Sequence, residues 1–161
     1  MQKVDKFRQY QASHQEHWDG IARQLDHWKG WGGSYRKRLA KIYQFHIPPG
    51  MHVLEIGCAC GDLLASLAPT RGVGIDLSFE MIERATQRHP QLTFMQGDIH
   101  EIELNEKFDY IIMSDLINDL WDVEEVFHKI HEWSKPSTRV MLNYYNRLWE
   151  WPLALAQKLH V

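Results

Sequence analysis

The sequence predicts an α/β fold in which a doubly wound, mostly parallel sheet follows an N-terminal helical cap. Three observations favour this fold. From residue 51 onward, short apolar runs alternate with amphipathic helical segments, which is the pattern of successive βαβ units. The segment Pro48-Pro49-Gly50 marks a boundary in front of the first apolar run. Residues 1–46, by contrast, are polar and aromatic and mostly lack strand-like runs.

The N-terminal residues predict two or three helices that form the cap. The helical segment SYRKRLAKIYQF has Ser34 as its candidate N-cap residue, because a serine side chain can accept a bond from a free amide of the first turn. We expect residues 1–47 to form this cap and residues 48–161 to form the α/β core of one structural domain. A chain of 161 residues is long enough to bury one such core.

Five buried strands are expected in the core, each coinciding with a short apolar run. They lie at 51–56, 72–77, 92–98, 108–115 and 138–145. Helices are expected at 62–68, 78–89, 123–134 and 148–160. Ser78 and Glu80 mark the start of the second helix, since a capping serine and an early acid suit the helix dipole. Ligands of such sheets bind beside the carboxyl ends of the strands, so the chemistry is expected in the loops.

The composition argues against several function classes. Lys and Arg total 18 against 21 Asp and Glu, a net charge of −3 that gives no electrostatic case for binding nucleic acid. No apolar run approaches the roughly 18 residues of a membrane-spanning helix. The N-terminus MQKVDKFRQYQ lacks the pattern of a signal peptide. With only two cysteines, we expect a cytoplasmic protein without a disulfide framework.

The loop after the first strand, in VLEIGCACGDLL, is rich in glycine. Glycines permit positive φ and let a ligand approach the backbone closely. A dinucleotide fingerprint, G-x-G-x-x-G, fails because Ala59 and Asp62 stand where its second and third glycines would be. A pattern E/D-x-G-x-G-x-G fits better, with Glu55, Gly57 and Gly61 in place and Ala59 at the middle glycine.

Two cysteines, Cys58 and Cys60, flank Ala59 in this loop. The sequence offers no second Cys/His pair to complete a metal site with them. A disulfide across one intervening residue would be strained. We therefore expect neither a metal nor a redox role for the two thiols.

Acids also follow the next three strands. Asp76 lies about 20 residues after the glycine loop, where a carboxylate can accept bonds from the hydroxyls of a ribose; its alternative role is to cap the helix that follows. Asp98 is positioned to accept from an adenine amino group, with Ile99 packing on the ring, although an Asp after a glycine is also an ordinary turn residue. Asp115 follows the fourth strand.

In combination these loops resemble the class I S-adenosylmethionine-dependent methyltransferases over roughly residues 50–146. The resemblance implies a Rossmann-like fold, S-adenosylmethionine as cofactor and S-adenosylhomocysteine as product. The cofactor-binding residues that it implies are Glu55, Gly57, Cys58, Ala59, Gly61, Asp76, Leu77, Asp98, Ile99 and Ser114. It also implies that the segment GIARQLDHWKGWGGSYRKRL belongs to a cap that closes over the cofactor.

Individual roles follow from the same resemblance. Glu55 would order the methionine moiety through water, and the backbone of residues 57–59 would line it. Asp76 would hold the ribose diol while Leu77 packs on the adenine. Ser114 and Asp115 would border the donor and acceptor, and Asp115 is the candidate catalytic residue.

The sequence departs from the family pattern at two points. Ala59 replaces the middle glycine, and its methyl group costs about 1 kcal/mol or more if the local φ is positive. The usual sheet has seven strands, whereas this chain ends after five and one helix, so either the domain is truncated or a partner covers the open edge. Such a partner would be a second copy of the chain or a glycosyltransferase domain, because SDLINDLWDV and VMLNYYNRLWEWP resemble a bacterial subgroup fused to one.

The function expected from this pattern is methyl transfer by in-line displacement to a small-molecule or carrier-linked acceptor. Asp115, Asp119 and a histidine of the cap are candidates for a base, although Asp119 and Asp122 are expected mainly as helix-start acids. One alternative is a catalytically incomplete S-adenosylmethionine-binding module of a larger assembly. A weaker alternative is an NAD(P)-dependent oxidoreductase, which the absent third glycine disfavours.

Several residues of the cap are expected to be structural. His14 and His17 are interpreted as a solvated or capping helix face, because no carboxylate stands at metal-binding spacing. The basic run from Arg36 to Lys41 is interpreted as a solvated face, with contact to an anionic substrate as the alternative. Trp18, Trp28 and Trp31 are expected to pack the cap against the core, with a base-stacking platform as the alternative.

Overall fold

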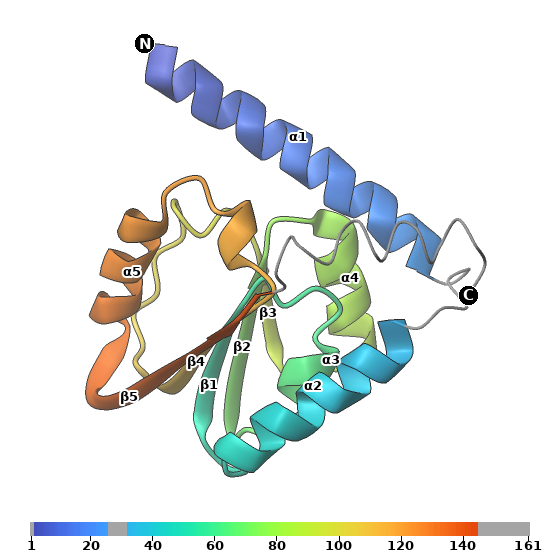
Figure 1. Ribbon diagram of the computed structural model, residues 1–161, viewed down its shortest axis with the longest axis vertical. Helices are drawn as coiled ribbons and strands as arrows, with labels where there is room; N and C mark the ends of the chain where they lie inside the picture. The colour runs from blue at the N-terminus through green and yellow to red at the C-terminus, as the bar shows by residue number, and fades with distance from the viewer. Residues whose placement is uncertain (1, 26–31, 145–161) are drawn as a thin grey trace.

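The computed structural model describes residues 2–25 and 32–144, and within these ranges it contains a five-stranded, entirely parallel sheet (Figure 1). The strand order is β3-β2-β1-β4-β5, so the order reverses at β1, as in doubly wound sheets. The strands are β1 (His52–Ile56), β2 (Arg71–Asp76), β3 (Thr93–Gln96), β4 (Phe108–Ser114) and β5 (Ser134–Asn143). The predicted fold class is therefore confirmed.

Helices cover both faces of this sheet. They are α1 (Gln2–Gln24), α2 (Gly32–His46), α3 (Asp62–Ser66), α4 (Phe79–Arg88) and α5 (Val123–Glu132), with a short 3₁₀ helix, η2 (Ile117–Asp119), after β4. One face packs on α5, and the other packs on α2 and α3. Helix α1 lies across the end of the sheet, beside α4 (Figure 1).

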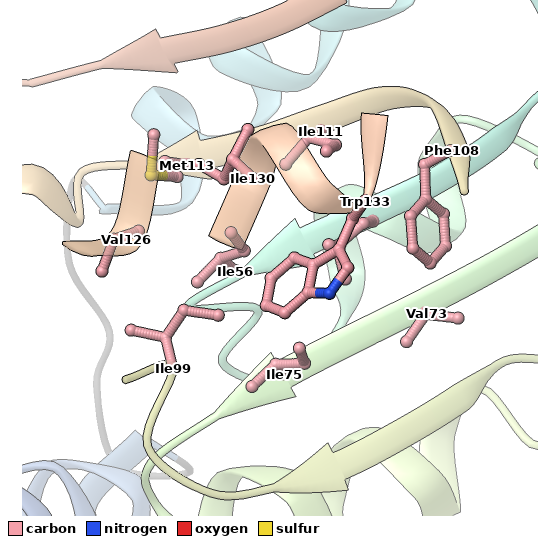
Figure 2. Close-up of a cluster of buried hydrophobic side chains, with 11 residues drawn as sticks. Ile56, Val73, Ile75, Ile99, Phe108, Ile111, Met113, Val126, Ile130 and Trp133 are labelled. Carbon is pink, nitrogen blue, oxygen red and sulfur yellow. The ribbon is translucent and has the colours of Figure 1, made fainter. Parts of the chain in front are cut away.

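Both faces of the central strands are buried, which explains their nearly continuous apolar sequences. Val53 points to the cluster under α2 and α3, whereas Leu54 and Ile56 belong to the cluster under α5. Trp133 follows α5 directly and is 1% exposed. Figure 2 shows its indole ring among the side chains of the central strands. This anchor fixes α5 against the sheet on the side of β4.

Several predicted boundaries are wrong. Helix α3 ends at Ser66 instead of residue 68, and β3 ends at Gln96 instead of residue 98. Helix α2 begins at Gly32 and not at Ser34, so Ser34 lies within the first turn and is not the N-cap residue. Helix α5 ends at Glu132, and β5 begins at Ser134 instead of residue 138. The polar start of β5 hid this extension, although it pairs with Phe108 across a register shift. The predicted helix at 148–160 lies outside the described residues.

The sheet ends at β5, whose outer edge pairs with no other strand among the described residues. In the same part of the chain, no helix is both long enough and apolar enough to cross a membrane.

Candidate functional site

A cavity of about 840 Å³ opens at the carboxyl ends of β1, β2 and β4 and in the loop after β3. Residues of α1 and α2 form its other wall. Nine of the ten predicted cofactor residues line it, namely Glu55, Gly57, Cys58, Ala59, Asp76, Leu77, Asp98, Ile99 and Ser114. Asp115, the candidate catalytic residue, lines it as well. The fold therefore brings together loops that the sequence had marked separately.

Gly61 is the predicted residue that does not line the cavity. It precedes α3 with a φ of +74°, and a Cβ atom there would lie 2.5 Å from the ring of Phe94. Gly61 is thus needed for a left-handed backbone and for close packing. Gly57 meets the same two demands inside the cavity, because its φ is +73° and a Cβ atom would lie 2.9 Å from Leu116.

The glycine loop is tied to β2 by its own backbone. The amides of Gly57 and Cys58 both donate to the carbonyl of Ile75, at 2.8 and 3.0 Å. The next amide, that of Ala59, donates to a carboxylate oxygen of Asp76 at 2.8 Å. Ala59 has a φ of +46°, so the alanine occupies the conformation in which its methyl group is unfavourable.

The two cysteines of the loop are buried, free thiols. Burial raises the pKa of Cys58 and of Cys60, which keeps both protonated at neutral pH. The sulfur of Cys60 lies 3.7 Å from that of Met81 in a cluster that also includes Trp18. This cluster joins α1 to α4, so the predicted packing role of Trp18 is confirmed. Trp28 and Trp31 lie outside the described residues.

Glu55 is almost completely buried at the end of β1, with 2% exposure. Its carboxylate accepts a bond of 3.0 Å from the amide of Leu64 in α3. Burial raises the pKa of Glu55 to about 8, although the bond from Leu64 opposes this shift. Glu55 therefore fixes α3 against β1 and presents a polar group to the cavity.

Asp76 ends β2 and uses both carboxylate oxygens locally. One accepts from the amide of Ala59, and the other accepts from the amide of Ser78 at 2.9 Å. Ser78 is itself the N-cap of α4, accepting from Met81, and it donates to Asp19 of α1. The predicted alternative role, support of the helix start, is thus present. Each oxygen still has a second lone pair for a ligand hydroxyl.

Asp98 follows β3 and forms a buried cluster that the sequence did not reveal. One of its oxygens accepts from both the amide and Nδ1 of His100, at 2.9 and 2.6 Å. The other accepts from Gln11 of α1 at 2.9 Å. Burial alone would raise the pKa of Asp98, but the bonds from His100 and Gln11 hold it below its ordinary value. Asp98 therefore joins the β3 loop to α1.

Asp115 lies just beyond β4 in the left-handed region, with a φ of +55°. Asn143 of β5 donates to one carboxylate oxygen at 2.7 Å, and Tyr35 of α2 donates to the other at 2.9 Å. The Asp115 amide donates to the Asn143 carbonyl at 3.0 Å. Burial and the neighbouring Asp115 raise the pKa of Tyr35 to about 12, so its hydroxyl remains a donor at neutral pH.

Several residues of this site were not predicted individually. Tyr10, His14 and Trp18 all line the cavity from α1, and their spacing of four residues places them on one helix face, which was a usable signal. His14 is partly buried there, and its Nδ1 lies 3.1 Å from the Tyr10 carbonyl of the same helix, whereas His17 is exposed. No sequence signal pointed to Asn143, because its partner Asp115 lies on another strand.

A family profile described as "Methyltransferase domain" matches residues 47–160. Phosphoethanolamine N-methyltransferase 2 of Caenorhabditis elegans is 29% identical over 126 residues, which is 71% of this chain and 29% of that protein. Nodulation protein S of Rhizobium tropici is 29% identical over 109 residues, 63% of this chain and 46% of that protein. The chain thus spans less than half the length of these two relatives.

Solved structures share the fold. The match to the DhpI–SAM–HEP complex has a TM-score of 0.68 at 18% identity, and it covers 88% of this chain and 70% of that chain. The match to NodS of Bradyrhizobium japonicum, solved with S-adenosylhomocysteine, has a TM-score of 0.58 at 23% identity. It covers 66% of this chain and 61% of that chain. The predicted resemblance is confirmed by the family profile, which covers more than half of the sequence. The chain belongs to the methyltransferase domain family.

Proposed function

We propose that this chain is an S-adenosylmethionine-dependent methyltransferase that acts on a small-molecule or carrier-linked acceptor. One observation carries the proposal: the acids that follow four parallel strands converge with a glycine loop on a single cavity. This placement at the carboxyl ends of the strands, near the point where their order reverses, is where α/β sheets bind ligands. The cavity volume of about 840 Å³ is within the range of small-molecule sites.

The free hydrogen-bonding capacity of the acids fits the nucleoside part of this cofactor. An ionised carboxylate has about four lone-pair positions. Asp76 uses two of them on backbone amides and keeps two for a ribose diol. Asp98 uses three, on His100 and Gln11, and keeps one for the adenine amino group. Leu77 and Ile99 line the same region and supply apolar surface for the ring.

The methionine part would lie at the glycine loop. Gly57 brings the backbone close to a ligand without a side chain, and Ala59 adds a single methyl group. Glu55 contributes a buried polar group below the loop, and Ser114 borders the neighbouring strand end. The cofactor, when bound, supplies a methyl group activated by its sulfonium. The contribution of the protein is alignment, which can supply roughly 7–11 kcal/mol of the barrier.

The relatives provide independent support for this chemistry. Several are named as N-methyltransferases, including the phosphoethanolamine enzymes and the N,N-dimethyltransferase of Streptomyces fradiae that acts on a dTDP-linked amino sugar. Because the chain spans only part of their length, we treat their activities as a guide to reaction class. The cytoplasmic location, the domain boundary at residue 47 and the fusion to a glycosyltransferase remain predictions.

A second candidate function is an S-adenosylmethionine-binding module without catalysis. The positive φ of Ala59 favours it, because the strain at the loop weakens the position where backbone and cofactor would meet. The two candidates differ in turnover but not in cofactor class.

Calorimetric titration with S-adenosylmethionine, S-adenosylhomocysteine and NAD tests both candidates. We expect both sulfur nucleosides to bind and NAD to give no heat above dilution. Binding of NAD without binding of S-adenosylhomocysteine would refute the proposal. Binding of the sulfur nucleosides without methyl transfer to any amine or hydroxyl acceptor would favour the module.

A further inference from the structure

His100 is a residue of the cavity wall to which the proposed function gives no role. In that function, the cavity has a cofactor end, beside β1, β2 and the β3 loop, and an acceptor end, beside Asp115. His100 lies at the cofactor end, two residues after Asp98, which would accept the adenine amino group. What its contacts imply for ligand recognition therefore rests on the proposed function.

His100 and Asp98 form a buried pair, in which the two side chains are 5% and 7% exposed. Nδ1 of His100 lies 2.6 Å from one carboxylate oxygen of Asp98. An ionised carboxylate can only accept hydrogen bonds, so Nδ1 carries the proton of this bond. The amide of His100 donates to the same oxygen at 2.9 Å. One residue thus supplies two donors to Asp98, and only the first depends on its side chain.

The other ring nitrogen of His100, Nε2, is engaged at the start of α5. Asp122, which caps α5 as expected of a helix-start acid, can donate its amide to Nε2 at 3.2 Å when the ring is neutral. When the ring is charged, Nε2 can instead donate to the Asp122 carbonyl at 3.3 Å. Nδ1 keeps its proton in both cases, so His100 donates to Asp98 in either charge state. Because both ring nitrogens are engaged, His100 is not a free base for the reaction.

Helix α1 closes the cluster from another side. Gln11 donates to the second oxygen of Asp98 at 2.9 Å. The ring of Phe7 packs edge-on against that of His100, with 5.6 Å between the ring centroids. Asp98 is therefore held by three hydrogen bonds from two directions, and one lone-pair position remains for a ligand in the cavity.

The same contacts keep Asp98 ionised although it is buried. Burial favours the neutral acid, but the bonds from His100 and Gln11 outweigh it and lower the pKa of Asp98. Burial also lowers the pKa of His100, but the bond to Asp98 and its charge raise it above the ordinary value. At the start of α5, the bond to Asp122 and the charge of Glu125 act in the same direction. A ring that is charged more often makes a stronger bond to Asp98.

We propose that His100 is a positioning residue that makes the cofactor end selective for a 6-amino purine over a 6-oxo purine. An ionised Asp98 accepts from the amino group of adenine. A 6-oxo purine presents an oxygen there, and two acceptors repel each other unless Asp98 takes up a proton. His100 opposes that proton, because it already donates to the carboxylate. By linkage, each tenfold by which protonation of Asp98 becomes harder raises the discrimination tenfold.

Calorimetric titration with S-adenosylhomocysteine and S-inosylhomocysteine measures this selectivity, because the two ligands differ at position 6 of the purine. We expect the unchanged chain to bind the adenine compound at least about 100-fold more tightly. His100→Leu removes the Nδ1 donor at similar side-chain volume, and the ratio of the two dissociation constants should fall to about tenfold or less. A loss of affinity that both ligands share leaves this ratio unchanged, so the ratio separates positioning of Asp98 from general loosening of the fold.

Two further variants control this measurement. His100→Asn is the conservative change, because its side-chain amide can donate where Nδ1 does, and it should restore most of the ratio. His89→Leu is the matched control: His89 lies 2.9 Å from an oxygen of Asp62 but does not line the cavity, so its loss should leave the ratio unchanged. Should His100→Leu fail to fold, Gln11→Leu removes the donor to the other oxygen of Asp98 and should also lower the ratio.

An unchanged ratio in His100→Leu, or equal falls in His100→Leu and His89→Leu, would overturn the inference. Adenosine and inosine, titrated into the ¹⁵N-labelled chain and followed at the amides of residues 98–100, repeat the comparison without the homocysteine part. A chain that prefers adenosine to inosine but does not bind S-adenosylhomocysteine would contradict the proposed function and leave the role of His100 intact. A chain without preference between the two nucleosides would overturn the inference.

Discussion

The two ends of the cavity are built in different ways. At the cofactor end, Asp76 receives bonds from backbone amides 17 and 2 residues away, and Glu55 from one 9 residues away. At the acceptor end, Asp115 receives bonds from side chains of Tyr35 and Asn143, which are 80 and 28 residues away. The first end is assembled by adjacent loops of one βαβ unit, and the second depends on how α2 and β5 dock.

This difference has a consequence for specificity. Backbone amides are present whatever the side chains, so the contacts of Asp76 and Glu55 tolerate sequence change around them. Asp98 differs, because it is held by the side chains of His100 and Gln11. The acceptor end is made of side chains on the cap and on the last described strand. Substitutions on α1, α2 or β5 can therefore change the acceptor while the cofactor end stays intact.

The largest expected effect is that of Asp76→Ala on the cofactor end. The change removes the carboxylate that accepts from the amides of Ala59 and Ser78. It also removes the two lone pairs that remain for the ribose, so we expect S-adenosylhomocysteine to bind about 100-fold more weakly or worse. Calorimetry measures this loss. Asp115→Asn is the matched change at the other end and should have a much smaller effect on the same affinity. Equal losses in the two variants would mean that the ends are not separate.

Next in size is the pH dependence that Glu55 imposes on stability. Its pKa is about 8 in the folded chain against an ordinary value of 4.5, so between these values the folded chain holds a proton that the unfolded chain has released. The free energy of unfolding therefore falls as pH rises from 4.5 to 8, by at most about 1.4 kcal/mol per pH unit.

Glu55→Gln removes this proton while keeping an oxygen for the Leu64 amide. Urea unfolding without cofactor at pH 5.5, 6.5 and 7.5 measures the free energy of unfolding. It should fall less steeply with pH for Glu55→Gln than for the unchanged chain, because the two chains share all other titrating groups. Parallel declines would show that Glu55 is ionised in the folded chain.

A smaller effect is expected from Ala59→Gly, which relieves the positive φ at the loop. The gain should be on the order of 1 kcal/mol in unfolding free energy, with tighter binding of S-adenosylhomocysteine. Ala68→Gly is the matched control, because Ala68 also has a positive φ, +47°, but does not line the cavity. We expect it to raise stability without changing cofactor affinity. A gain in affinity from both variants would assign the effect to general stability.

The smallest effect is that of Tyr35→Phe at the acceptor end. It removes one donor to Asp115, but Tyr35 is 49% exposed, so water replaces the bond and the cost in unfolding free energy should be about 0.5 kcal/mol. Tyr43→Phe removes a bond to Asn143 from a residue that is 2% exposed and should cost more, about 1 kcal/mol. Thermal or urea unfolding compares the two. A larger cost for Tyr35→Phe would show that the exposed bond to Asp115 stabilises the fold more than the buried bond to Asn143.

The sequence by itself determined the fold class, the order of the strands along the chain and the acids that follow them. These features depend on local rules, namely apolar periodicity, turn residues and the rule that ligands bind at strand ends. For the same reason, nine of the ten predicted cofactor residues line one cavity. The boundary errors at α2 and β5 arose where local signals were weak, at a glycine-rich start and in a polar edge strand.

Only the tertiary structure decided the φ of Ala59, the partners of Asp98 and the network around Asp115. Ala59 is forced into the left-handed region because its amide reaches Asp76 of the next strand. Gln11 and Tyr35 reach their carboxylates across 87 and 80 residues. Contacts between residues so far apart in the sequence leave no periodic pattern in it, because they depend on how separate elements are placed relative to one another. The cofactor end could therefore be predicted from local patterns, whereas the hydrogen-bond network of the acceptor end emerged only from the packing of the cap and β5.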